Sequence, residues 1–73
     1  MKNWKRLNAG NYEMATDLGI WQVTEDRDIA QGLPWDVTPP GERGPTDSYR
    51  LLRDAKQACE GDYRWRKSQE AGA

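Results

Sequence analysis

The hydrophobic pattern of this chain changes its period once, and a proline-rich segment marks the change. Residues 39–45 read PPGERGP, and prolines at this density exclude both an α-helix and a central β-strand. Before the segment, apolar and aromatic side chains recur at every second position, whereas after it they recur at helical spacing. The chain is therefore predicted to form a set of β-strands followed by one α-helix.

Four short runs are predicted to be strands, and all but the first carry the period of two that is typical of half-buried strands. They are residues 4–7, 12–16, 20–24 and 33–38, and the third is the richest in β-branched and aromatic residues. Asp17, Leu18 and Gly19 between the second and third runs favour a tight turn, so these two runs are predicted to form a hairpin. Because Pro34 lacks an N–H, the last run is predicted either to lie at a sheet edge or to begin after Pro34.

A single apolar stripe follows the proline-rich segment and predicts a helix from Ser48 to Glu60, with Thr46 or Asp47 as its N-cap. The stripe consists of Leu51, Leu52, Ala55, Ala58 and Cys59. Gly61 is expected either to end this helix or to lie inside a longer one at a cost of about 1 kcal/mol. Residues 61–73 are accordingly predicted to be a helical extension or a frayed tail, with Ser68 to Ala73 fraying.

These patterns predict an α+β fold, in which a three- or four-stranded antiparallel meander packs on one C-terminal helix. A length of 73 residues suffices for one domain, residues 1–73, with its core at about residues 4–60. Four Trp and three Tyr, with no Phe, must supply most of the large apolar surface. The side chains expected to meet in the core are Tyr12, Met14, Trp21, Val23 and Trp35 from the sheet, and Leu51, Leu52, Ala55 and Cys59 from the helix.

The residue types that perform most catalysis and metal binding are scarce. The chain has no histidine and one cysteine, Cys59, which excludes a Cys–His pair, a zinc site and an intrachain disulfide. The segment 41–44 lacks the lysine and hydroxyl ending of a phosphate-binding loop. Glu25, Asp26 and Asp28 do not follow the ligand order of an EF-hand and favour a solvated turn. No catalytic residue, metal site or cofactor is predicted, and the chain is not expected to be an enzyme.

The expected location is the cytoplasm. A small chain with one cysteine and no signal peptide suits a reducing compartment. No apolar segment approaches the roughly 20 residues that span a membrane. The sequence therefore predicts a soluble cytoplasmic protein.

Aromatic and basic residues alternate near the C-terminus, in the order Tyr63, Arg64, Trp65, Arg66, Lys67. Guanidinium groups and indole rings of this kind bind an acidic protein surface or nucleic acid. Alternatively, the two aromatic side chains pack on the sheet while the basic ones stay solvated. The net charge of -1, with six acidic and two basic side chains in residues 25–47, argues against a protein built around the phosphate backbone.

Trp4 is a second candidate contact. If Trp21 and Val23 point inward, then Trp4, Leu18 and Ile20 are left on the opposite face of the sheet. An exposed cluster of that kind marks a protein interface or a homodimer surface. Alternatively, Trp4 closes the end of the core.

Several spaced segments also occur together in a recognisable order. They are Trp4, Leu7, Gly10, Tyr12, GIWQV at 19–23, PWDV at 34–37 and LRDAKQAC at 52–59. Over residues 4–60 the chain resembles small Trp-rich accessory proteins of actinobacterial bacteriophages, in which short strands precede a helix with leucine, two residues and Ala-Lys. The resemblance implies an accessory protein that acts inside an infected host, and it implies no specific activity.

The order of elements is also similar to that of the arm-binding domain of tyrosine integrases, where a three-stranded sheet enters the DNA major groove. Such a sheet needs basic and amide side chains on its open face. The side chains expected on that face here are Glu13, Gln22, Thr24 and Asp36, of which only Gln22 suits base recognition. This departure argues against DNA recognition by the sheet.

The predicted function is a non-enzymatic protein-binding module, a phage protein that modulates a host or phage protein. Its predicted partner-binding residues are Trp4, Tyr63, Arg64, Trp65, Arg66 and Lys67. The alternative is a small nucleic-acid-binding domain that uses the basic and aromatic C-terminal segment together with Lys2, Lys5 and Arg6.

Overall fold

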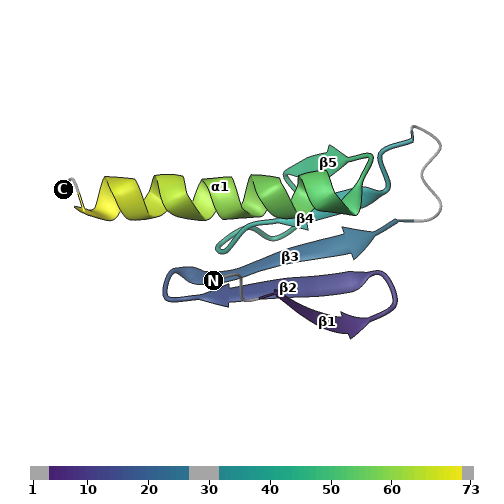
Figure 1. The fold of residues 1–73 in the computed structure, drawn as a ribbon, viewed down its shortest axis with the longest axis horizontal. Helices are drawn as coiled ribbons and strands as arrows, with labels where there is room; N and C mark the ends of the chain where they lie inside the picture. Colours follow the sequence, from purple (N-terminus) through teal and green to yellow (C-terminus); the bar gives the residue numbers. More distant parts are fainter. Residues whose placement is uncertain (1–3, 27–31, 72–73) are drawn as a thin grey trace.

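A computed structural model describes residues 4–26 and 32–71, and this part of the chain forms five strands and one helix (Figure 1). The strands are β1 (Trp4–Asn8), β2 (Asn11–Thr16), β3 (Gly19–Glu25), β4 (Trp35–Thr38) and β5 (Asp47–Tyr49), and the helix is α1 (Leu52–Ala71). All neighbouring strands are antiparallel and follow one another in the sheet as they do in the chain. The α+β class is confirmed, and the sheet has five strands where three or four were expected.

The register of the sheet fixes which side chains meet the helix. Met14 stands opposite Trp21, and Val23 stands opposite both Tyr12 and Val37, so these side chains share one face. Trp21 and Val23 are fully buried. The alternate positions lie on the open face, as predicted for Glu13, Gln22, Thr24 and Asp36.

The core lies between this face and α1, whose backbone packs against β3, β4 and β5. Its buried side chains are Met14, Trp21, Val23, Val37, Ala55 and Cys59, with Tyr12, Trp35 and Leu52 partly buried around them. Leu51 was expected in the helical stripe, but it precedes α1 and is 45% exposed. The last turns of α1 extend beyond the β2–β3 turn (Figure 1).

The predicted start of the helix is wrong, because residues 47–49 form β5 instead. Tyr49 pairs with Trp35, and the Ser48 hydroxyl donates a hydrogen bond of 2.7 Å to Asp36 across the same two strands. This pairing satisfies the backbone hydrogen bonds of residues that the local sequence predicts to be helical. The N-cap predicted at Thr46 or Asp47 is therefore not formed. The helix begins at Leu52.

Gly61 lies inside α1, which is the second of the two alternatives considered for it. Ser68–Ala71 are helical and not frayed, because side chains beyond Gly61 are tied to the sheet as described below. β4 begins after Pro34 and lies between β3 and β5, so it is not an edge strand. Asp28 of the predicted polar turn and residues 72–73 of the predicted tail lie outside the described residues.

Candidate functional site

The five residues of the basic and aromatic segment do not share one face of α1. Tyr63, Arg66 and Lys67 are partly buried and have partners on the sheet side. Arg64 and Trp65 are exposed, Trp65 to 62%. The structure therefore divides the predicted binding segment into a part that holds the helix and a part that is exposed.

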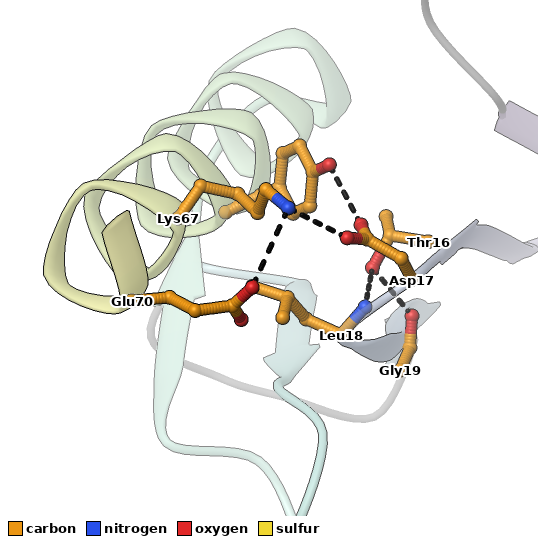
Figure 2. A network of polar contacts seen from close by, with 7 residues as sticks. Thr16, Asp17, Leu18, Gly19, Lys67 and Glu70 are labelled. Carbon is orange, nitrogen blue, oxygen red and sulfur yellow. Dashed lines mark hydrogen bonds and ion pairs between the residues drawn. The ribbon is translucent and has the colours of Figure 1, made fainter. Parts of the chain in front are cut away.

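Asp17, in the turn between β2 and β3, accepts hydrogen bonds from two of these side chains (Figure 2). The Tyr63 hydroxyl donates a hydrogen bond of 2.8 Å to Asp17, and the Lys67 ammonium donates one of 2.7 Å. Both contacts stabilise the carboxylate, so the pKa of Asp17 lies below its ordinary value of 3.8. The same hydrogen bonds raise the pKa of Tyr63 and of Lys67.

The turn that carries Asp17 is itself held by a side chain. The Thr16 hydroxyl accepts a hydrogen bond of 3.0 Å from the Leu18 N–H and donates one of 2.9 Å to the Gly19 carbonyl (Figure 2). A hydroxyl that bonds its own turn in this way fixes the turn conformation. Asp17 is thus presented to α1 by a local structure that the sequence encodes.

Arg66 packs over the largest buried side chain of the core. Its guanidinium lies 5.3 Å from the centre of the Trp21 ring and forms a 3.1 Å ion pair with Asp62. The Trp21 indole N–H donates to the same carboxylate at 3.0 Å. The Tyr63 ring meets Trp21 edge-on, with ring centres 5.7 Å apart and planes at 87°. Arg66 and Tyr63 therefore serve the packing of α1 on β3.

Trp4 lies on the helix side of the sheet, where it stands opposite Met14. Its indole N–H donates a 2.7 Å hydrogen bond to Glu60 of α1. The expectation that Trp4, Leu18 and Ile20 share the opposite face is wrong, because Leu18 also packs against the core while Ile20 is 45% exposed. The alternative, in which Trp4 closes the end of the core, describes its position.

A groove lies along the flank of α1 that faces Trp4, and we call it the Trp4 groove. It has a volume of about 490 Å³ and is lined by Trp4, Leu52, Arg53, Lys56, Gln57 and Glu60. The groove exists because the α1 backbone packs against β3, β4 and β5, while β1 lies beyond them at the edge of the sheet. In the described residues, side chains such as those of Trp4 and Glu60 connect β1 to α1.

The Lys56 ammonium lies near two aromatic rings beside the groove. The ammonium nitrogen lies 4.6 Å from the centre of the Tyr12 ring and 5.5 Å from that of Trp4. Both are cation–π distances, so the two rings and the Trp4–Glu60 hydrogen bond hold the wall of the groove in one conformation. Leu52 was predicted as a core residue and Lys56 as a solvated one, and neither was predicted to bind a partner, although their spacing of four residues puts them on one side of a helix.

A second cavity of about 280 Å³ lies on the opposite flank of α1, with Cys59 and Tyr49 in its lining. Burial, together with the nearby carboxylates of Asp62 and Glu60, raises the pKa of the Cys59 thiol to about 12. The thiol is therefore protonated at neutral pH and is a poor nucleophile. Among the residues that the structure describes, no group of three or more His, Cys, Asp and Glu side chains is placed to hold a metal ion.

Comparison of the chain with protein-family models, with curated proteins and with solved structures gives no match. The resemblance to phage accessory proteins therefore stays a prediction. In the described ranges 4–26 and 32–71, no helix is long and apolar enough to cross a membrane.

Proposed function

We propose that this domain is a non-enzymatic protein-binding module and that the Trp4 groove is its contact site. The observation that supports this most directly is the groove itself: an indole and a leucine side chain lie beside charged groups in a groove with a volume of about 490 Å³. Apolar anchors ringed by polar groups are the usual anatomy of a protein contact. Trp and Arg are also the residues most enriched at the centres of such contacts.

Preorganisation adds to this argument. The Trp4 indole is bonded to Glu60 and flanked by the Lys56 ammonium, so its conformation is fixed before any partner arrives. A fixed side chain loses little entropy on binding, and each immobilised flexible side chain otherwise costs about 0.5–1.5 kcal/mol. A rigid indole in a groove is therefore a favourable anchor site.

The proposal extends to the biological setting predicted from the sequence. The module acts in the cytoplasm as a phage accessory protein that modulates a host or phage protein. The phage setting is supported by the resemblance over residues 4–60, and the cytoplasmic location by the single cysteine. It carries no expectation about the identity of the partner.

The C-terminal segment favours a protein partner over nucleic acid. Arg66 pairs with Asp62 at 3.1 Å and Lys67 pairs with Asp17 at 2.7 Å, so two of its three basic side chains are already neutralised. Phosphate binding depends on basic groups that release counterions, and such binding weakens steeply with salt. A titration with duplex and single-stranded oligonucleotides at low salt should accordingly show no salt-dependent binding.

Capture of partners on the immobilised domain tests the proposal. Trp4→Ala should reduce capture of a specific protein, while Trp65→Ala should leave it unchanged, because Trp65 does not line the groove. Circular dichroism of both variants checks that they fold, and Trp4→Phe separates loss of the indole N–H from loss of the ring. Equal capture by the Trp4→Ala and Trp65→Ala variants, or capture of no specific protein, would contradict the proposal.

A further inference from the structure

We infer that the partner enters as an extended acidic segment, which adds to the outer edge of β1 as a further strand and places side chains in the Trp4 groove. This inference rests on the proposed protein-binding function and specifies the chemistry of the partner. Three features of the described residues support it: the position of β1, the register of its side chains, and the charges around the groove.

β1 is the end strand of the sheet and pairs with β2 on one side only. Within the described residues, no strand pairs with its outer edge. An edge of this kind presents backbone N–H and C=O groups that an added strand can bond. The opposite end strand, β5, has three residues against five in β1, whose pairing with β2 is regular from Trp4 to Arg6 and shifts register between Arg6 and Asn8.

The register of β1 directs an added strand toward the groove. Trp4 and Arg6 share the helix side with their partners Met14 and Tyr12, whereas Lys5 points to the open face with Glu13. A strand added outside β1 would lie about 4.8 Å away, with alternate side chains on the helix side. Those side chains would enter the space between Trp4 and the flank of α1.

The charges favour an acidic segment. Arg6, Arg53 and Lys56 are basic groups on the helix side of the edge or in the groove wall. The nearby carboxylates are Glu60, which accepts the Trp4 N–H, and Asp54, which lies 3.7 Å from Arg53, so three basic groups stand against two acidic ones. On the open face, Lys5 stands opposite Glu13, so the excess positive charge is on the helix side.

The same charges argue against a second copy of this chain as the added strand. Self-pairing of β1 would set Lys5 and Arg6 of one copy beside those of the other, and like charges on adjacent strands are destabilising. Charged side chains on edge strands commonly prevent such self-association. The carboxylates of an acidic strand would instead attract Lys5 and Arg6 of β1. The expected pattern of the added strand is an apolar side chain beside Trp4 and Leu52 and a carboxylate beside Arg6 and Lys56.

Synthetic octapeptides with blocked ends provide the probe. The peptide TLTETLTE places leucine and glutamate alternately on one face of a strand, and TLTKTLTK reverses its charge. A third peptide carries the acidic sequence with N-methyl groups on the edge that would bond β1. Each is titrated at millimolar concentration into the isotope-labelled domain, while backbone amides, the Trp4 indole N–H and amide hydrogen exchange are followed by NMR.

TLTETLTE should shift the amides of β1 and the Trp4 indole N–H, slow hydrogen exchange in β1, and bind at least tenfold more tightly than TLTKTLTK. N-methylation should abolish binding. Arg6→Glu should invert the preference between the two peptides, because Arg6 is exposed on β1 and faces the groove side. The matched control Arg64→Glu makes the same charge change on an exposed position of α1 outside the groove and should leave the preference unchanged.

Equal binding of the acidic and basic peptides, equal binding of the N-methylated peptide, or no binding at millimolar concentration would each overturn strand addition. Concentration-dependent dimerisation with protection of β1 would also overturn it, in favour of a second copy. Trp4-dependent capture of a protein, combined with failure of every peptide, would leave the proposed function intact while refuting this inference.

Discussion

Replacing Gly19 by alanine measures how closely the β2–β3 turn packs against the segment that follows β4. Gly19 has a φ of +125°, and a Cβ built there lies 2.7 Å from the Cβ of Pro40 and 3.0 Å from its Cγ. The backbone conformation alone should cost alanine about 1–3 kcal/mol. Forcing an extra methyl group against Pro40 should add about 1–3 kcal/mol, the usual cost of overpacking.

Gly41 supplies the matched control. Its φ is +87°, and a Cβ at this position meets no atom within 4 Å. Gly41→Ala should therefore cost only the backbone contribution, about 1–2 kcal/mol. The expected losses are about 2–6 kcal/mol for Gly19→Ala and about 1–2 kcal/mol for Gly41→Ala. A chain of this length is stable by roughly 4–11 kcal/mol, so the larger loss approaches complete unfolding.

Urea denaturation followed by tryptophan fluorescence measures both losses, since the Trp21 ring is buried only in the folded state. Adding Pro40→Gly to Gly19→Ala removes the ring atoms that the new methyl group would meet. The double-mutant cycle should then return a coupling free energy of about 1–3 kcal/mol. Equal losses for Gly19→Ala and Gly41→Ala, together with no coupling to Pro40→Gly, would refute the close packing of the turn.

Two further predictions concern titrating groups. Because Lys67 and Tyr63 lower the pKa of Asp17, its carboxylate stabilises the fold above pH 3.8 and this contribution is lost as pH falls through the lowered folded-state value. Asp17→Asn should therefore lower the urea midpoint at pH 7, with the two proteins converging in acid; a constant difference down to pH 2 would contradict the assignment. The Cys59 thiol, with its pKa raised to about 12, should react with a thiol reagent at pH 8 only as fast as the fold opens, and rapid labelling of the native protein would contradict its burial.

Local pattern was sufficient to predict the strands of the meander. Trp21 and Val23 lie two positions apart, with the polar Gln22 between them, and both are buried. When one face of a sheet is covered, only one register places such alternating apolar side chains on the covered face. The pattern failed at residues 47–49, where three residues are too few to show a period. Their strand state depends on Trp35 and Asp36 of β4, and no local rule connects segments that far apart.

The sequence identified some residues of the candidate site, such as Trp4, but not how they are arranged in space. The partner of the Trp4 indole, Glu60, lies 56 positions away in the chain, so the groove between β1 and α1 could not be derived from either segment alone. The C-terminal alternation of aromatic and basic residues was visible, but its division into two faces depends on Asp17 and Trp21. Tertiary contacts also keep Gly61 within the helix against its low propensity.

The succession of β1 to β5 has a kinetic consequence. Every strand finds its partner in the adjacent stretch of chain, and contacts of short sequence separation close with little loss of chain entropy. We expect the meander to assemble hairpin by hairpin, on a timescale faster than that of sandwiches and barrels with crossed connections. The Trp4–Glu60 hydrogen bond then closes last, since it joins the first strand to the helix that follows the fifth.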